Sequence, residues 1–422
     1  MPNAVILSIG NELLRGRTVD TNFTWLARKL YTLGIQVQIH YTVPDTEEWV
    51  CASLSGAVER ADIIITTGGL GPTGDDHTRK GLSRFLERKL IFNQRIAKKI
   101  RQYFDNRGIE MPESNLVQAY LPKDAVPLEN NEGTAPGIFA KYDSKLIFLL
   151  PGPPNEMKDV FRSVELILKK EIDLQVKESR VFRTIGVPES LLSEWIDELD
   201  ISEEVEIAFY PAFGAVDIFI STQKEKLESL QSTEHTLLRK LNPYIYADNE
   251  NRRIEAVVGE LLRERNETIA FAESCTGGML SSAIVDIPGS SDYFSGGIIS
   301  YSNQAKQKLL GVNASNIHKY GAVSPQVAKQ MADGIRQKFS TSYGIGITGI
   351  AGPTGETENK PVGLVYIAVA TPENIFVRKY NFTGGRDSVR NRTKVAALNI
   401  LWCQLKFDNI LHYPFQDGGS FI

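Results

Sequence analysis

The chain has few cysteines and no long apolar run, and both absences limit what it can be. Its three cysteines, Cys51, Cys275 and Cys403, are odd in number and far apart in 422 residues, which predicts neither a disulfide framework nor a zinc cluster. No segment reaches the roughly 18 apolar residues that a membrane-spanning helix needs. The N-terminus also has no basic region, apolar run and cleavage site of a secretion signal. We therefore expect a cytoplasmic protein that does not contact a membrane.

The chain also has little excess charge and few histidines. A formal net charge of −4 provides no basic footprint for nucleic acid, so we do not expect nucleic acid as a partner. After residue 250 the histidines are His318 and His412, which argues against a Ser-His-Asp triad there. The composition, 42% hydrophobic and 23% charged residues, is that of a globular protein. A chain of 422 residues predicts two or three domains.

Apolar runs rich in Val and Ile alternate with helical stretches in two parts of the chain. In the first part, strands are predicted at residues 4–9, 36–41, 62–67 and 145–150, with helices at 20–33 and 47–60. This alternation favours a parallel α/β sheet with crossover helices. A second pattern consists of a helix at 254–264, strands at 268–272, 298–301, 344–347 and 363–370, and a helix at 389–405.

The segment between these two patterns has a different texture. Predicted strands at 179–186 and 207–222 flank a helix at 189–198, another helix follows at 224–241, and the polar residues 248–252 indicate a linker. We therefore predict the α/β class, with two three-layer α/β domains at 1–170 and 251–408. A small α+β module at 171–250 joins them, and a tail at 409–422 shows no clear pattern.

Gly-rich turns and carboxylates follow three strands of the first domain, in residues 10–12, 68–78 and 151–156. Ligands of open α/β sheets bind beyond the carboxyl ends of the strands, where glycine N–H groups and a helix N-terminus suit an anion. The predicted site residues are Glu12, Asp20, Asn22, Asp45, Gly68, Gly69, Asp75, Asp76, Thr78, Pro153 and Glu156.

Several of these residues are carboxylates, which are suitable ligands for a hard divalent cation. The adjacent Asp75 and Asp76 are the metal ligands that we predict. A cation there would offset pyrophosphate charge and polarise a phosphoryl oxygen. The alternative is that Gly and Asp after a strand only form turns and helix caps, and His77 is expected to be a solvated loop residue.

A small nucleophile stands at a predicted strand-to-helix turn in the second domain. Residues 273–278 read ESCTGG, and helical spacing begins at Leu280. Ser274 is a weak nucleophile at neutral pH and needs a base, while backbone N–H groups of Thr276, Gly277 and Gly278 at the helix N-terminus would hold an oxyanion. Two alternatives stay open. Ser274 only caps the helix, or Cys275 is the nucleophile instead of a small buried residue.

Lys306 is the predicted base, about one helical turn after the strand that we expect to end at Tyr301. A desolvated lysine can lose its proton near neutral pH, and Tyr301 would pass a proton or fix the substrate. The turn Thr348-Gly349 suits a phosphate or ribose, and Arg386 would clamp a phosphate, with Arg390 as a second candidate. Each of these residues, taken alone, is more often a solvated or packing residue.

The first 170 residues resemble the molybdopterin-binding fold of molybdenum-cofactor enzymes, and more closely the N-terminal domain of the competence/damage-inducible family, CinA. The resemblance rests on residues 10–14 (GNELL), 20–22 (DTN), 68–78 (GGLGPTGDDHT), 131–137 (NEGTAPG) and 151–157 (PGPPNEM). For some members it implies a metal-dependent ADP-ribose pyrophosphatase, which would use a divalent metal and potassium.

Residues 254–405 are similar to the C-terminal domain of the same family, which resembles nicotinamide-nucleotide amidase. The motifs are residues 273–278, 288–291 (PGSS), 301–303 (YSN) with Lys306, 321–324 (GAVS), 348–353 (TGIAGP) and 360–363 (KPVG). The resemblance places the family's catalytic Ser, Lys and Tyr on Ser274, Lys306 and Tyr301, and its substrate-binding Thr and Arg on Thr348 and Arg386.

This resemblance implies that nicotinamide mononucleotide is hydrolysed to nicotinic acid mononucleotide and ammonia, with no cofactor, by a homo-oligomer such as a dimer. Together with ADP-ribose cleavage, the reaction would recycle pyridine-nucleotide breakdown products. A hypothesis of another class is a non-catalytic adaptor in competence or DNA damage that acts through partners. The presence of Ser274, Tyr301 and Lys306 together argues against an inactive second domain.

Overall fold

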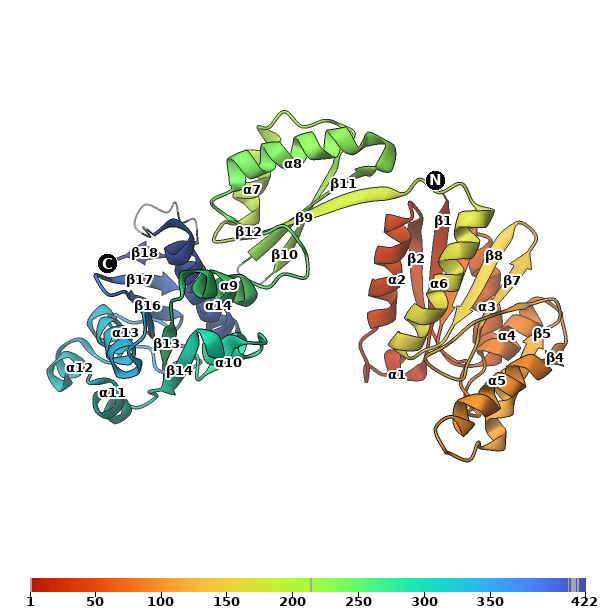
Figure 1. Ribbon diagram of the computed structural model, residues 1–422, viewed down its shortest axis with the longest axis horizontal. Helices are drawn as coiled ribbons and strands as arrows, with labels where there is room; N and C mark the ends of the chain where they lie inside the picture. Colours follow the sequence, from red (N-terminus) through yellow and green to blue (C-terminus); the bar gives the residue numbers. More distant parts are fainter. Residues whose placement is uncertain (1, 213–214, 409, 411–414, 416) are drawn as a thin grey trace. The chain divides into compact units, whose positions relative to one another are not determined.

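A computed structural model describes residues 2–212, 215–408, 410, 415 and 417–422 (Figure 1). It divides into two compact units, which we describe separately. Unit 1 comprises Met1–Glu178 and Gln223–Glu225, and unit 2 comprises Ser179–Thr222 and Lys226–Ile422. Within the described ranges, no helix is long and apolar enough to cross a membrane.

Unit 1 is built on a six-stranded sheet in the order β2-β1-β3-β8-β7-β6. The first four strands are parallel to one another, as the alternation predicts. The other two strands were not predicted: β7 pairs antiparallel with β8, and β6 pairs antiparallel with β7. The strands are β1 (Asn3–Ile9), β2 (Gln36–Val43), β3 (Ile63–Thr67), β6 (Val126–Leu128), β7 (Gly137–Tyr142) and β8 (Lys145–Leu150). A separate hairpin pairs β4 (Leu90–Phe92) with β5 (Tyr120–Pro122).

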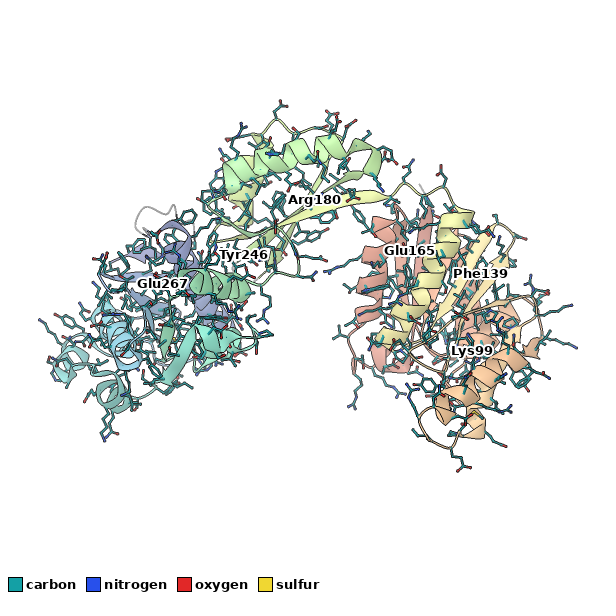
Figure 2. All side chains as sticks on the ribbon, in the orientation of Figure 1. Lys99, Phe139, Glu165, Arg180, Tyr246 and Glu267 are labelled. Carbon is teal, nitrogen blue, oxygen red and sulfur yellow. The ribbon has the colours of Figure 1, made fainter. Side chains whose placement is uncertain are left out.

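Helices cover both faces of this sheet, which makes the predicted three layers. The helices are α1 (Asn11–Leu14), α2 (Thr21–Thr32), α3 (Glu47–Val58), α4 (Thr78–Phe85), α5 (Gln94–Asp105), the 3-10 helix Glu113–Ala119 and α6 (Pro154–Glu171). Ala4 and Ile6 of β1 pack with α2 and α6, whereas Val5 and Leu7 pack with α3 and α4. Because both faces are buried, β1 is an unbroken apolar run and does not alternate. Figure 2 labels Phe139 of β7, whose ring stacks on Phe148 of β8.

The N-terminal part of unit 2 is the small α+β module, with a sheet in the order β10-β11-β9-β12. Its elements are β9 (Lys177–Ile185), α7 (Glu189–Asp197), β10 (Glu206–Ala212), β11 (Ala215–Gln223), the 3-10 helix Lys224–Lys226, α8 (Leu227–Leu241) and β12 (Ile245–Ala247). The run at 207–222 thus forms two antiparallel strands. Its core is continuous with that of the following domain, because Phe182 and Leu237 belong to the same buried cluster as Val258 and Leu401.

The C-terminal part of unit 2 has a sheet in the order β14-β13-β15-β16-β17-β18. Strands β14, β13 and β15 are parallel, and the other three are antiparallel. The strands are β13 (Ile269–Glu273), β14 (Phe294–Ile299), β15 (Tyr343–Gly349), β16 (Leu364–Ala370), β17 (Ile375–Asn381) and β18 (Ser420–Phe421). Strands β17 and β18 were not predicted. The tail was predicted to have no clear pattern, but its described residues Ser420–Phe421 form β18, which pairs with β17.

Helices again cover both faces. They are α9 (Ile254–Arg265), α10 (Met279–Val285), the 3-10 helix Ser290–Asp292, α11 (Asn303–Leu310), α12 (Ala314–Tyr320), α13 (Pro325–Phe339) and α14 (Arg386–Phe407). Phe271 of β13 packs with α9, α10 and α14, whereas its neighbours Ala270 and Ala272 pack with α11, α12 and α13. The α/β class with two three-layer domains and a small module between them is therefore confirmed.

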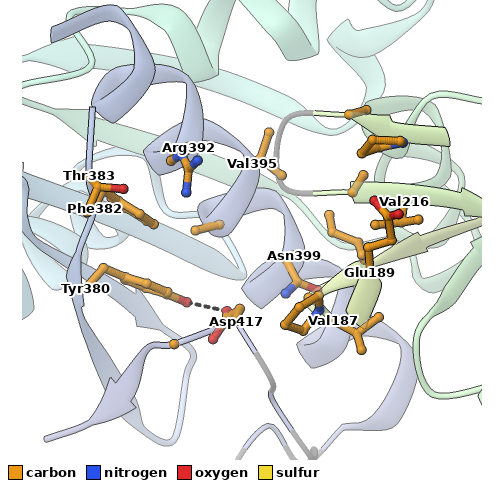
Figure 3. A pocket seen from close by; sticks show the side chains of 18 of the residues that line it. Val187, Glu189, Val216, Tyr380, Phe382, Thr383, Arg392, Val395, Asn399 and Asp417 are labelled. Carbon is orange, nitrogen blue, oxygen red and sulfur yellow. Dashed lines mark hydrogen bonds between the residues drawn. The ribbon is translucent and has the colours of Figure 1, made fainter. Parts of the chain in front are cut away.

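A cavity of about 510 Å³ lies in unit 2, lined by residues of the module, of β17 and of α14 (Figure 3). Tyr380 donates a hydrogen bond of 2.9 Å to Asp417 of the tail at its edge. The side chains of Arg392 and Asn399, both from α14, also line it.

Candidate functional site

Ser274 follows the carboxyl end of β13, between the parallel strands β14 and β15. It is 8% exposed, and the next four residues lead into α10. Gly277 and Gly278 have φ angles of 62° and 96°, which favour glycine. The predicted strand–turn–helix arrangement therefore places the hydroxyl at a sharp turn at the centre of the sheet edge.

Lys306 comes to the same point from the neighbouring element. β14 ends at Ile299, two residues before the predicted end, because Ser302 caps α11 and accepts a hydrogen bond of 3.1 Å from the N–H of Ala305. Lys306 therefore lies in the first turns of α11 and points back into the protein. Its Nζ lies 3.0 Å from Ser274 Oγ and donates to the carbonyl of Ser300 at 2.6 Å.

Burial sets the acidity of this pair. Lys306 is 1% exposed, and desolvation lowers the pKa of its ammonium to about 8. Burial also raises the pKa of the Cys275 thiol to about 11, so the rival nucleophile stays protonated at neutral pH. His318 is an exposed residue of α12, and His412 lies outside the described residues. The structure thus brings together a serine and a lysine amine that loses its proton near pH 8.

A cavity of about 220 Å³ opens over these two side chains. Its other lining residues include Tyr301 and three of the six predicted substrate-binding residues, Thr348, Gly349 and Arg386. The other three, Thr276, Gly277 and Gly278, do not line it. Tyr301 is 64% exposed and is not a packing residue. Its hydroxyl lies 3.4 Å from Arg386 Nη2, while Nη1 of the same guanidinium donates to the carbonyl of Gly352 at 2.7 Å. Thr348 is buried and donates to the carbonyl of Ala322 at 2.9 Å.

Two of the three predicted oxyanion donors are engaged in other hydrogen bonds. The N–H of Gly277 donates to the carbonyl of Ser274 at 3.1 Å, and the N–H of Gly278 donates to the carboxylate of Glu273 at 3.0 Å. The buried Glu273 carboxylate also accepts hydrogen bonds from the N–H groups of Leu280 and Ser281. The prediction that Gly277 and Gly278 hold an oxyanion is therefore wrong in this geometry, because the Ser274 carbonyl takes the first N–H and Glu273 takes the second. The N–H of Thr276 as an oxyanion donor stays a prediction.

Arg390 also differs from its predicted role. Its Nε donates to the carbonyl of Cys275 at 3.2 Å and its Nη2 to the carbonyl of Thr276 at 2.9 Å. Arg390 does not line the cavity, so it braces the turn after Ser274 and is not placed to clamp a phosphate there. The hydroxyl of Thr276 is fully buried and has no hydrogen-bond partner among the described residues.

Lys360 fixes the opposite wall, a role that its sequence motif did not suggest. Its ammonium donates to the carbonyls of Tyr320, at 2.5 Å, and of Val323, at 2.8 Å. Val323 and Ala322 line the cavity. Because Thr348 holds the carbonyl of Ala322, both wall residues are tied through their backbone.

Unit 1 has its own cavity, of about 280 Å³, at the carboxyl ends of β1, β3 and β8. Its lining includes eight of the eleven predicted residues: Glu12, Asp20, Asn22, Asp45, Gly68, Gly69, Asp75 and Asp76. Asn22 links two of these strand ends, because its Nδ2 donates to Thr67 Oγ1 at 2.9 Å and to the carbonyl of Gly152 at 2.7 Å.

The other three predicted residues lie elsewhere. Thr78 is buried and donates to the carbonyl of Gly68 at 2.9 Å. Pro153 is the N-cap of α6, and the neighbouring Pro154 lines the cavity in its place. Glu156 accepts a hydrogen bond of 2.6 Å from Asn130 and so supports the loop before β7.

Only glycine fits well at positions 68 and 69, because a side chain would be too close to neighbouring atoms and because the φ angles of 106° and 65° favour glycine. A Cβ on Gly68 would lie 2.1 Å from the carbonyl oxygen of Ile9. The N–H of Gly68 donates to the carbonyl of Leu150 at 3.0 Å, so it is not available to an anion as predicted.

The carboxylates of this cavity have different environments. Burial would raise the pKa of Asp20, but hydrogen bonds from His40, from the N–H of Phe23 and from Ser8 lower it to about 2. For Asp45, burial dominates and raises the pKa to about 6, with the negative charge of Asp76 adding to it. A cation beside Asp45 would offset both effects.

Asp76 is held by hydrogen bonds within its own loop. Its Oδ1 accepts the N–H of Gly71 at 2.8 Å, and its Oδ2 accepts the N–H of Thr73 at 2.8 Å. The buried Arg79, which was not predicted, donates to the carbonyl of Gly71 at 3.0 Å from the other side of the loop. Asp76 therefore folds the loop with both carboxylate oxygens, and the Asp75–Asp76 metal pair stays a prediction.

No three His, Cys, Asp or Glu side chains converge as a metal-binding group within the described ranges. Mg²⁺ is usually held by one or two carboxylates together with water and substrate phosphates. Asp45 and Asp75, which line the cavity, fit a cation shared with a phosphate ligand in that way. They do not fit a cation held by the protein alone.

Comparison with known proteins agrees with this arrangement. Residues 251–405 match the CinA C-terminal domain, residues 5–170 a probable molybdopterin binding domain, and residues 179–247 the damage-inducible protein CinA KH domain. A competence-damage inducible protein of Halothermothrix orenii is 43% identical over 96% of this chain and 99% of its own length. The chain belongs to the CinA family.

Other CinA relatives show the same full-length match. A CinA-like protein of Fervidobacterium nodosum is 40% identical over 95% of this chain and 98% of its own length. Among solved structures, the competence/damage inducible protein CihA of Agrobacterium tumefaciens is 36% identical and covers 34% of this chain and 93% of its own, with a TM-score of 0.33. The CinA assignment rests on the full-length relatives and the domain matches.

Proposed function

We propose that unit 2 hydrolyses the carboxamide of nicotinamide mononucleotide, with Ser274 as nucleophile and Lys306 as general base. The observation that supports this most directly is the 3.0 Å separation between Lys306 Nζ and Ser274 Oγ in a buried site. The lowered pKa of Lys306, about 8, leaves a useful fraction of neutral amine at physiological pH.

In the proposed reaction, Ser274 Oγ bonds to the carboxamide carbon while Lys306 takes its proton. Negative charge develops on the carboxamide oxygen close to the newly formed ammonium, which stabilises it electrostatically. The C–N bond then breaks, the leaving nitrogen takes the proton from Lys306, and ammonia departs. Water attacks the acyl ester by the same route, with Lys306 again moving the proton, and nicotinic acid mononucleotide leaves.

The rest of the cavity supports a nucleotide substrate. The guanidinium of Arg386 lines the space and is anchored on one side by the carbonyl of Gly352. An anchored guanidinium is well suited to a phosphate, because its planar fork matches two oxygens. Tyr301 lies beside it at the rim of the cavity.

The test is ammonia release from nicotinamide mononucleotide by wild type, Ser274→Ala and Cys275→Ala, with and without chelator. We expect release to persist with chelator and in Cys275→Ala, and to fall by orders of magnitude in Ser274→Ala. Full release by Ser274→Ala would exclude Ser274 as nucleophile. No release by wild type would favour the adaptor hypothesis or a different amide substrate.

A second proposal concerns unit 1, as a metal-dependent pyrophosphatase that acts on ADP-ribose. The support is the cavity at the strand ends, in which the buried Asp45 carries a pKa of about 6. Asp45 and Asp75 would hold the cation together with the pyrophosphate, and the cation would polarise a phosphoryl oxygen. The test is cleavage of ADP-ribose across a panel of divalent metals with potassium, by wild type and Asp45→Asn. Absence of cleavage by wild type in every condition would overturn the proposal.

A further inference from the structure

Two charged side chains of opposite sign hold the turn that carries Ser274. Glu273, directly before the nucleophile, is 1% exposed and accepts four hydrogen bonds. Its Oε2 accepts the N–H groups of Gly278, at 3.0 Å, and Leu280, at 3.2 Å. Its Oε1 accepts the N–H of Ser281 at 2.9 Å and the hydroxyl of Ser281 at 2.6 Å. The carboxylate thus ties the end of β13 to the first turn of α10.

The side chain of Arg390 holds the same turn by donating hydrogen bonds to carbonyl groups of the turn. Its donors lie 3.2 Å from the oxygen of Cys275 and 2.9 Å from that of Thr276, the two residues after Ser274. These bonds join residues about 115 positions apart, so they connect the turn to α14. A second interaction anchors the guanidinium, since its Nη1 lies 3.8 Å from Asp387.

We infer that Glu273 and Arg390 are positioning residues that hold Ser274 at its distance from Lys306, an inference that rests on the proposed amidase function. Neither side chain lines the cavity that contains Ser274, so neither touches the substrate. The carboxylate of Glu273 binds N–H groups of the turn, and the guanidinium of Arg390 binds carbonyl groups of the turn. Together they leave the turn with little freedom to move Ser274 Oγ away from Nζ.

The inference has a further consequence for the reaction. The N-terminus of α10, which would ordinarily stabilise an anion, is satisfied by the charge of Glu273. Charge on the substrate oxygen is therefore stabilised by groups that line the cavity, chiefly the ammonium formed on Lys306. Glu273 contributes geometry, and its loss should lower the reaction rate without changing the pH at which Lys306 titrates.

The experiment measures the reactivity of Ser274 without a nucleotide. Phenylmethanesulfonyl fluoride has no phosphate or ribose, and Ser274 Oγ would attack its sulfur to form an S–O bond while the S–F bond breaks. Fluoride leaves, and Lys306 takes the hydroxyl proton and returns it to water. The labelling rate is followed by intact mass from pH 6 to pH 9, for wild type, Glu273→Gln and Arg390→Lys, each corrected for the folded fraction.

Both substitutions keep similar size and remove the necessary contacts. Glu273→Gln places an amide NH₂ against N–H donors. Arg390→Lys keeps the positive charge but loses the planar guanidinium that donates to two carbonyl groups at once. We expect labelling to slow at least tenfold in each, with an unchanged pH midpoint, and kcat for the nucleotide to fall with little change in KM. Glu273→Asp keeps the charge but shortens its reach, and it should show a smaller loss.

Matched controls are available in the same domain. Glu255→Gln changes another buried glutamate in the first turn of a helix, α9, which pairs with Arg253. Arg392→Lys changes an exposed arginine two residues after Arg390 on α14. Both should label at the wild-type rate.

Several outcomes would overturn the inference. Wild-type labelling in Glu273→Gln or Glu273→Asp would exclude positioning by Glu273. Wild-type labelling in Arg390→Lys with a raised KM for the nucleotide would make Arg390 a substrate ligand. If wild type labels at Ser274 but releases no ammonia from nicotinamide mononucleotide, the proposed substrate fails while the labelling test of positioning still applies. If Glu273→Gln does not fold, Glu273→Asp and Ser281→Ala decide, since unchanged labelling in both would overturn the role of Glu273.

Discussion

Lys306 Nζ lies 3.0 Å from Ser274 Oγ, although the two residues are 32 positions apart in the chain. The parallel pairing of β13 with β14 explains this proximity. Ser274 follows the end of β13, and the segment after β14 carries Lys306, so both arrive at the same edge of the sheet. The N-cap at Ser302 then starts α11 early enough to turn Lys306 inward.

Removing the amine should nearly abolish amide hydrolysis without unfolding the domain. Lys306→Met replaces a buried amine with an apolar chain of similar length, so we expect kcat to fall by about 10²–10⁴-fold. Thermal unfolding should be unchanged or shifted upward, because a desolvated polar group is lost. Lys308→Met, on the exposed side of the same helix, is the control. Equal kcat in Lys306→Met and Lys308→Met would exclude Lys306 as the base.

The amidase rate should follow the titration of Lys306. Only the neutral amine accepts the serine proton, and its pKa is about 8, so activity should rise with pH and level off above that value. Well below it, the neutral fraction falls tenfold for each pH unit, and kcat/KM, which reports the free enzyme, should fall in the same proportion. A pH profile of kcat/KM from 5.5 to 9.5 measures this. A flat profile through pH 8 would contradict the assignment.

Arg386 should select for the phosphate of the substrate. We expect Arg386→Met to raise KM for nicotinamide mononucleotide by about 10- to 100-fold, because a hydrogen bond to a charged group contributes about 1.5–3 kcal/mol. Hydrolysis of nicotinamide riboside, which has no phosphate, should change little. Arg392→Met, on the same helix, serves as the control. An equal loss with both substrates would assign Arg386 a purely structural role.

Asp45 should destabilise unit 1 when it is charged. Its pKa is about 6 in the fold against 3.8 for an ordinary aspartate, so the folded state holds the proton more tightly, and stability falls as pH rises through this interval. Asp45→Asn should therefore raise the denaturant midpoint of unit 1 at pH 8 and have a smaller effect at pH 4. Mg²⁺ with ADP-ribose should stabilise wild type more than the variant. An Asp45→Asn protein less stable than wild type at pH 8 would contradict this prediction.

Local pattern was sufficient for much of the fold. The strand at 145–150 coincides with β8, a buried apolar run that ends before Pro151, and the predicted start of the strand at 36 coincides with that of β2. Ser274 and Lys306 could also be chosen from the sequence, since each lies at a strand-to-helix junction of one sheet. The antiparallel strand β17 was missed, because Ile375–Asn381 contains charged residues within a mixed edge region.

By itself the sequence determined the α/β class, the order of the domains and the choice of Ser274 and Lys306 as the proposed reactive pair, because these follow from short-range periodicity and from motifs a few residues long. Tertiary structure decided what each polar group does. Glu273 takes the N–H of Gly278, one of the donors expected for an oxyanion, Asp76 folds its own loop, and Arg390 binds the turn that follows Ser274. Desolvation of Lys306 was likewise a tertiary effect. These outcomes depend on contacts between distant segments, and a linear pattern does not specify which donor meets which acceptor.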